Sequence, residues 1–136
     1  MSELCAAVIG VGYLGNFHAQ KYKQIPGVRL VAVVDSDPTR RTHIADRLGV
    51  EGFENHEEIL SSVDIVSIVV PPAQHYAIAR DCLMEGVHCL VEKPLTELVS
   101  HAEDLIDIAR SKSVVLQVGH LERFNPVARK LAGLID

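Results

Sequence analysis

Three glycines near the amino terminus have the spacing of a loop that binds phosphate. Gly10, Gly12 and Gly15 form the pattern G-x-G-x-x-G between an apolar, strand-like run and a helix-like segment. The first glycine permits a tight turn, the second lets backbone N–H groups approach a pyrophosphate, and the third lets the helix pack on the strand. The helix N-terminus adds partial positive charge. Because such glycines also serve packing alone, the predicted dinucleotide site, which includes Tyr13 and Leu14, depends on its context.

An acidic residue follows the next strand-like run, where dinucleotide sites bind a ribose. Asp35 lies 20 residues after Gly15, at the end of the β-branched run 29–34. A carboxylate at this position accepts hydrogen bonds from ribose hydroxyls and repels a 2′-phosphate. The sequence therefore favours NAD as the cofactor over NADP.

Two other interpretations of this segment stay open. Asp35 could only open the turn 35–38 or cap the next helix, although Asp37 is the better cap because Pro38 suits the first helical position. Arg40 and Arg41 could each reach a 2′-phosphate from the first turn of that helix. NADP therefore remains the less favoured cofactor.

Polar residues and prolines follow the later strand-like runs, at the sheet edge where ligands of parallel sheets bind. The candidate residues are Pro71, Pro72 and His75 after the fourth run, Glu92, Lys93 and Pro94 after the fifth, and His120, Glu122, Arg123, Phe124 and Asn125 after the sixth. Each could instead end a strand, begin a helix or lie in a solvated loop. We expect ordinary structural roles for four of the histidines that stand elsewhere, which are His18, His56, His88 and His101.

Lys93 is the residue from which we predict chemistry. It would lie near the nicotinamide end of a dinucleotide extended across the sheet, with a backbone stiffened by Pro94. A lysine there can hydrogen-bond a substrate hydroxyl and exchange the proton that accompanies hydride transfer. Glu92 beside it could orient the ammonium. No residue spacing in the chain predicts a metal site.

The elements that must position these residues alternate along the chain. Strands are expected at 4–9, 29–34, 52–53, 64–70, 87–91 and 114–119, and helices at 13–23, 39–48, 57–61, 75–85 and 98–112. Apolar residues make up 48% of the chain and aromatic residues 4%, so Val, Ile, Leu and Ala must build the core. The pattern predicts an α/β fold, a doubly wound and mostly parallel Rossmann sheet of about six strands with a C-terminal linking helix.

Charge and hydropathy exclude several classes of partner. The net charge of −5 gives no basic surface for nucleic acid, and no apolar run is long enough to cross a membrane. The amino terminus lacks the pattern of a signal peptide, so a cytoplasmic location is expected. Cys5, Cys82 and Cys89 stand in apolar surroundings without metal-ligand spacing and are predicted to be buried and reduced.

Three motifs together resemble one enzyme family. These are the continuation of the glycine loop into Asn16, Phe17 and His18, the Glu-Lys-Pro sequence 92–94, and the segment 119–126 with the sequence GHLERFNP. The chain from residue 4 to 126 is similar to the N-terminal cofactor domain of the glucose-fructose oxidoreductase, inositol dehydrogenase and rhizopine catabolism (Gfo/Idh/MocA) family.

The resemblance implies roles for individual residues. Lys93 matches the family's catalytic lysine, and Pro71 and Pro72 match positions along the cofactor, although the family usually has Thr-Pro or a similar pair there. GHLERFNP is similar to the subgroup that oxidises the 3-hydroxyl of UDP-N-acetylglucosamine, which implies a nucleotide-sugar substrate. His120, where the family usually has an aromatic residue, would contact that substrate with two further side chains, Arg123 and Asn125.

The resemblance also implies a second domain. We expect a NAD(P)-binding Rossmann domain over residues 1–124. Residues 125–136 would begin a helix that links it to a substrate domain, which is absent here. That second domain is also expected to form the interface of a homo-oligomer. An apolar stripe within 127–135 would then fold back on the sheet or dock on another copy. The expected function is the cofactor half of an NAD-dependent oxidoreductase, inactive alone; the alternative is a non-catalytic module that binds dinucleotides or senses redox state.

Overall fold

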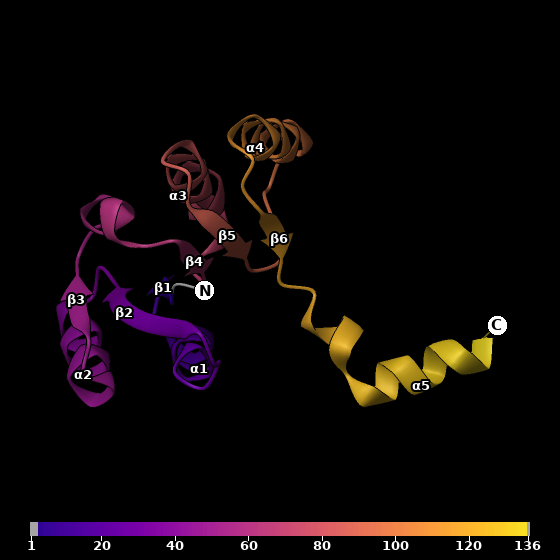
Figure 1. The fold of residues 1–136 in the computed structure, drawn as a ribbon. Coiled ribbons are helices and arrows are strands. Elements are labelled where there is room, and N and C mark those ends of the chain that lie inside the picture. Colours follow the sequence, from indigo (N-terminus) through magenta and orange to yellow (C-terminus); the bar gives the residue numbers. More distant parts are fainter. Residues whose placement is uncertain (1–2, 136) are drawn as a thin grey trace.

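Six parallel strands form the central sheet of the computed structural model, which describes residues 3–135 (Figure 1). Their order is β3-β2-β1-β4-β5-β6. The strands are β1 (Leu4–Ile9), β2 (Val28–Val34), β3 (Glu51–Phe53), β4 (Ile65–Ile68), β5 (His88–Val91) and β6 (Leu116–Val118). All five pairings between neighbours are parallel, which confirms the predicted doubly wound α/β sheet.

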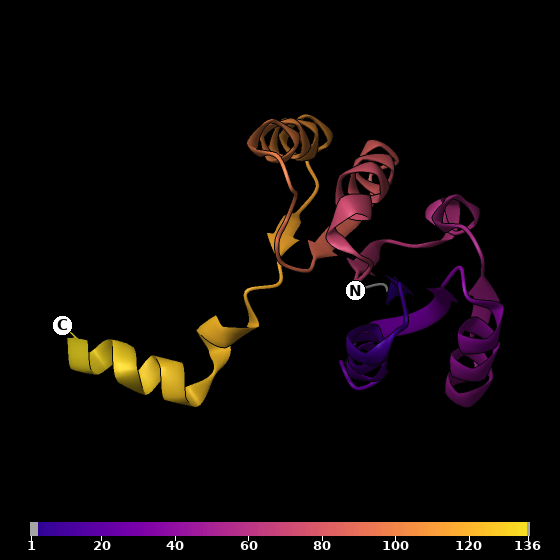
Figure 2. The same cartoon turned by 180° about the vertical axis from the view of Figure 1, so that it is seen from behind.

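Helices cover both faces of this sheet. On one face lie α1 (Tyr13–Tyr22) and α2 (Pro38–Leu48), and on the other lie α3 (Pro72–Met84) and α4 (Val99–Lys112) (Figure 1, Figure 2). The chain changes direction across the sheet between β1, which pairs with β2, and β4 on its other side. In open parallel sheets the crevice at such a switch point binds the ligand.

The apolar core is divided by the sheet into two layers. Along β1, Ala6 and Val8 belong to the layer under α1 and α2, while Ala7 and Ile9 belong to the layer under α3 and α4. Successive side chains of a strand point to opposite faces, so a strand covered on both faces must be apolar throughout. This explains why the strands appear in the sequence as continuous apolar runs.

Two short segments differ from the predicted elements. The helix expected over 57–61 is instead two 3₁₀ turns, η1 (His56–Glu58) and η2 (Leu60–Ser62). Ile59, which is fully buried, separates them, and the Ser62 hydroxyl donates to the Ile59 carbonyl at 2.9 Å. The strand expected over 64–70 ends at Ile68, and α3 begins at Pro72 rather than at His75, because a proline is tolerated in the first helical turn.

One of the three cysteines differs from its predicted environment. Cys82 and Cys89 are buried and free, as expected. Cys5 is also free but only partly buried, because it lies on β1 near the amino end of the sheet, where the Arg29 guanidinium reaches its sulfur at 3.3 Å. The expectation of a buried Cys5 was therefore wrong.

The last helix leaves the body of the molecule. After the 3₁₀ turn η3 (Leu121–Phe124), α5 (Pro126–Ile135) extends away from the sheet (Figure 1, Figure 2). Its apolar residues Val127, Leu131 and Leu134 are exposed, so the structure does not have the first of the two expected arrangements, in which the helix folds back on its own sheet, while docking on another copy stays a prediction. Within residues 3–135, no helix is both long and apolar enough to span a membrane.

Substituting Gly15 tests the contact between the first helix and the first turn. A Cβ atom at Gly15 would lie 1.8 Å from the Gly10 carbonyl oxygen, which is backbone and cannot move aside alone. We expect Gly15→Ala to lower the free energy of unfolding by about 1–3 kcal/mol in urea titrations. Gly133→Ala in α5, where nothing lies within 4 Å of the added atom, is the control. Equal stability of Gly15→Ala and the parent chain would contradict this account.

Candidate functional site

A groove of about 800 Å³ lies at the carboxyl edge of the sheet. Loops that follow all six strands contribute to its walls, because parallel strands bring all their carboxyl ends to one edge. The candidate site residues that line it are Gly10, Gly12, Leu14, Asp35, Pro71, Pro72, His75, Glu92, Lys93 and Glu122, and Arg40 and His56 line it as well. The structure thus joins the glycine loop and Lys93 in one continuous site.

The glycine loop has the geometry that phosphate binding requires. Gly10 has a φ of +86°, and a Cβ there would lie 2.5 Å from the Val69 carbonyl oxygen. Gly12 is the N-cap of α1, and nothing lies within 4 Å of a Cβ built on it. The backbone at Gly12 is therefore open toward the groove, and the first N–H groups of α1 are free of side-chain caps, which suits a pyrophosphate.

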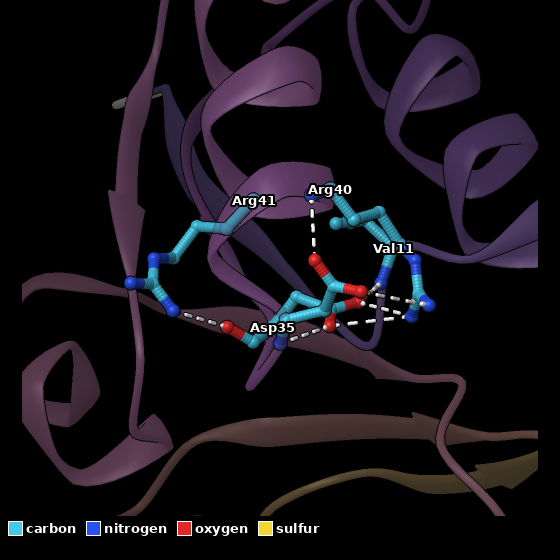
Figure 3. A network of polar contacts seen from close by, with 5 residues as sticks. Val11, Asp35, Arg40 and Arg41 are labelled. Atoms are coloured by element: carbon cyan, nitrogen blue, oxygen red, sulfur yellow. Dashed lines mark hydrogen bonds and ion pairs between the residues drawn. The ribbon is translucent and has the colours of Figure 1, made fainter.

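The carboxylate of Asp35 joins the glycine loop to α2, as Figure 3 shows. Its Oδ2 atom accepts the Val11 N–H at 2.9 Å, and its Oδ1 atom accepts the Asp37 N–H at 2.9 Å. The Arg40 guanidinium contacts both carboxylate oxygens at 3.2 and 3.3 Å. Asp35 therefore opens the turn into α2 and also holds the glycine loop, while it lines the groove.

The two arginines that could reach a 2′-phosphate are both engaged. Arg40 is about half exposed and pairs with Asp35. Arg41 donates to the Asp35 carbonyl oxygen at 2.7 Å (Figure 3). Its guanidinium also lies 3.9 Å from the Glu54 carboxylate. Asp37 caps α2 by accepting the Arg40 N–H, and this bond is the largest cause of the lowered pKa of its carboxyl. The capping role thus belongs to Asp37.

Lys93 and Glu92 form the opposite part of the groove. Lys93 is exposed, and within residues 3–135 its ammonium makes no ion pair, so it is available to a ligand. The Glu92 carboxylate is buried; it accepts the Lys93 N–H at 3.3 Å and faces the His18 ring at 3.2 Å. Gly119, which follows β6, leaves room for this carboxylate, because a Cβ there would lie 2.7 Å from Glu92 Oε1.

His18 has a place in the site that the sequence analysis missed. Its Nε2 atom faces Glu92 Oε1, and its Nδ1 atom lies 3.2 Å from the Ser67 hydroxyl, so it contacts a groove residue, while its expected structural role stays a prediction. Two signals in the sequence pointed to this cluster. Ser67 is a polar residue inside a strongly apolar strand, and His18 and Tyr22 are four residues apart on one face of a helix.

His75 fastens two loops of the groove together. It is 1% exposed, and its ring nitrogens lie 2.8 Å from the Pro94 and Val70 carbonyl oxygens. One carbonyl belongs to the loop after β5 and the other to the loop after β4, where Pro71 and Pro72 line the groove. The ring therefore holds the Lys93 loop against the proline turn.

Several predicted site residues lie outside the groove lining. Tyr13 is 86% exposed and packs edge-on against Phe17, and Gly15 is buried under the loop. Asn125 accepts the Val127 N–H at 2.9 Å and so stabilises the start of α5. The substrate candidates that do not line the groove are His120, Arg123 and Asn125, although their neighbours Leu121 and Glu122 do.

Three of the other histidines have local partners. His88 accepts the Val115 N–H, and His101 stacks on Tyr76 with 3.9 Å between ring centroids. His56 lines the groove, but its two ring nitrogens face the Glu57 and Asp81 carboxylates at 3.4 and 3.0 Å. These three side chains place potential metal-ligand atoms within 4.8 Å of one another, and the ion pairs account for the arrangement.

Gly12→Ala separates phosphate binding from folding. The added methyl group enters open space, so we expect stability to stay within about 1 kcal/mol of the parent chain. The same methyl group stands where a pyrophosphate must approach the backbone, so calorimetry should show NAD affinity at least about tenfold weaker. Undiminished NAD binding by Gly12→Ala would mean that the cofactor does not approach this turn.

Asp35→Asn tests the choice between NAD and NADP. The amide oxygen can still accept the Val11 N–H, while the charge that repels a 2′-phosphate is gone. We expect the preference for NAD, measured as the ratio of the two dissociation constants, to fall about tenfold or more. Glu122→Gln removes another carboxylate of the groove and should leave the ratio unchanged. An unaltered ratio in Asp35→Asn would show that Asp35 does not select the cofactor.

Comparison with known proteins agrees with this geometry. Residues 4–120 match the family described as "Oxidoreductase family, NAD-binding Rossmann fold" (GFO_IDH_MocA). A UDP-N-acetylglucosamine 3-dehydrogenase of Acidithiobacillus ferrooxidans is 40% identical over 131 residues, which cover 96% of this chain and 41% of that protein. An inositol 2-dehydrogenase of Rubrobacter xylanophilus is 33% identical, over 91% of this chain and 37% of that protein.

Solved structures show the same relationship. The structure of the Acidithiobacillus ferrooxidans enzyme matches with a TM-score of 0.90, over 98% of this chain and 44% of that one. A scyllo-inositol dehydrogenase from Lactobacillus casei with bound NAD(H) and scyllo-inositol, 26% identical, also gives 0.90, over 99% of this chain and 41% of that one. The chain thus spans about two fifths of these relatives. It belongs to the Gfo/Idh/MocA oxidoreductase family, as an NAD-binding domain with a Rossmann fold.

Proposed function

We propose that this chain is the cofactor-binding half of an NAD-dependent dehydrogenase that oxidises a secondary hydroxyl of a sugar or nucleotide sugar. The observation that carries the proposal is the position of Lys93, which lines the same groove as the glycine loop and Asp35. A domain that only binds a dinucleotide needs the loop and the carboxylate. It does not need an unpaired ammonium at the other end of the groove.

The residues of the groove suit the parts of NAD. The open backbone at Gly12 and the start of α1 would hold the pyrophosphate, and Asp35 would accept hydrogen bonds from the adenosine ribose. Because Arg40 already contacts both oxygens of that carboxylate, ribose hydroxyls must share it or displace the guanidinium. Pro71 and Pro72 would flank the cofactor between the two ends.

Lys93 would handle the proton of the reaction. Bound NAD supplies an acceptor for the hydride that leaves the carbinol carbon. The hydroxyl proton must leave in the same reaction, and a neutral Lys93 amine positioned at that oxygen can take it as a general base. The Glu92 carboxylate contacts the backbone N–H of Lys93 and so fixes the loop that carries this side chain.

A nucleotide sugar is the substrate class we propose. It is supported by the 40% identity to a UDP-N-acetylglucosamine 3-dehydrogenase and by the segment 119–126, whose residues Leu121 and Glu122 reach the groove. A substrate domain following the helix that begins near residue 125 would complete the pocket. The exposed apolar residues of α5 are consistent with such a neighbour, and an oligomer would form through that domain.

Lys93→Ala tests the catalytic proposal in a protein that carries residues 1–136 together with the proposed substrate domain. We expect NAD affinity to stay unchanged and kcat with UDP-N-acetylglucosamine to fall about 100-fold or more, because the general base is lost. Lys112→Ala, which removes an exposed lysine at the end of α4, is the matched control. If Lys93→Ala turned over at the parent rate, the alternative of a non-catalytic dinucleotide module would be favoured.

A further inference from the structure

A series of hydrogen bonds among four buried or half-buried polar side chains connects α1 to the Lys93 loop. The Tyr22 hydroxyl lies 2.9 Å from the Ser67 hydroxyl, which lies 3.2 Å from His18 Nδ1. His18 Nε2 in turn lies 3.2 Å from Glu92 Oε1. This series of hydrogen bonds ends where Glu92 Oε2 accepts the Lys93 N–H. The series thus connects α1, which carries Tyr22 and His18, through Ser67 on β4 to Glu92 at the end of β5.

For a neutral His18 ring, the chemistry of the donors and acceptors fixes the direction of every hydrogen bond in this series. A carboxylate only accepts, so His18 must donate from Nε2 to Glu92. A neutral ring then has a bare Nδ1 atom, which accepts from the Ser67 hydroxyl. The Ser67 oxygen can accept from Tyr22. Burial, the largest cause, raises the pKa of the Tyr22 phenol, so that hydroxyl keeps the proton it donates.

This direction leaves each member satisfied, whereas the reverse does not. If His18 carried its proton on Nδ1, the bare Nε2 atom would face the Glu92 carboxylate and two acceptors would meet. The Ser67 hydroxyl would then accept from both His18 and Tyr22, and its own proton would find no acceptor among these side chains. Unpaired polar groups are costly when buried, and the side chains of His18 and Glu92 are each 9% exposed. The geometry therefore selects one tautomer of His18.

We propose that His18 is a positioning residue for Lys93, acting through Glu92. The Nε2–H of His18 holds one carboxylate oxygen, and the other oxygen holds the Lys93 backbone N–H. Because His18 lies on α1, whose N-terminus faces the groove, the contact ties the lysine loop to the helix that binds the cofactor. The importance of this contact for turnover rests on the function proposed above, whereas the contact itself does not.

Two substitutions of His18 separate positioning from simple packing. The amide nitrogen of a glutamine reaches about as far as His18 Nε2, while that of an asparagine reaches only as far as Nδ1. His18→Gln should therefore keep the donor to Glu92, and His18→Asn should lose it. A role in packing alone would disturb the contacts of α1 with the sheet in both variants, most in the smaller asparagine, without a selective effect on the Lys93 amide.

The first measurement is made on the parent 136-residue chain. Long-range ¹H–¹⁵N NMR spectra of His18 should show a proton on Nε2 and none on Nδ1. A proton on Nδ1, alone or together with Nε2, would overturn the proposal. This result does not depend on whether any variant folds.

The second measurement follows the Lys93 amide. In His18→Gln its chemical shift and hydrogen-exchange rate should match the parent chain, whereas in His18→Asn exchange should be about tenfold faster. The Glu92 amide, which donates to the Ile68 carbonyl, is the internal reference. His101→Gln, which removes a half-buried ring of α4 stacked on Tyr76 of α3, is the matched control. Equal Lys93 exchange in the two His18 variants would overturn the proposal.

Turnover then separates this proposal from the proposed function. In a protein with the substrate domain, His18→Asn should lower kcat about tenfold without changing KM for NAD, and His18→Gln should restore it. If the Lys93 amide responds as described while kcat does not, Lys93 is positioned by His18 but is not the catalytic base. If Lys93→Ala abolishes turnover while its amide ignores His18, the catalytic proposal stands and the positioning proposal fails.

Discussion

The parallel direction of all six strands is the constraint on which the site depends. It places every loop that follows a strand at one edge of the sheet, so residues as distant in sequence as Gly12, Asp35 and Lys93 line one groove. The same constraint requires a helix after most strands, because a parallel neighbour can be reached only by a crossover. The helices bury both faces, and this leaves the carboxyl edge as the place where polar side chains can gather.

At this edge of the sheet, hydrogen bonds with backbone groups fix the positions of the candidate functional side chains. Asp35 accepts the N–H groups of Val11 and Asp37, so the carboxylate proposed to select the cofactor also holds the glycine loop. Glu92 accepts the Lys93 N–H, and His75 contacts the Pro94 and Val70 carbonyls. A substitution at these positions therefore changes the shape of the groove as well as its chemistry, which is why isosteric variants are more informative than alanine.

Local patterns in the sequence predicted the strands, the principal helices and the glycine loop, because each depends on residues close together in the chain. The 3₁₀ turns around Ile59 were missed because burial of that one side chain sets them. His18 was missed because its partners, Ser67 and Glu92, are 49 and 74 residues away. Local patterns mark Ser67 as a polar residue in an apolar strand and place His18 and Tyr22 on one helix face, but they do not show that these side chains meet. The placement of α5 likewise depends on what it packs against and not on its own apolar stripe.

The measurement that tests the central claim most directly is an NMR titration of the 136-residue chain with NAD. If one dinucleotide extends along the groove, the backbone amides of Gly12, Asp35 and Lys93 should shift together, with a single dissociation constant. Shifts confined to the glycine loop and Asp35, with Lys93 unaffected at saturation, would contradict the account. They would show that the cofactor does not reach the lysine on which the proposed chemistry depends.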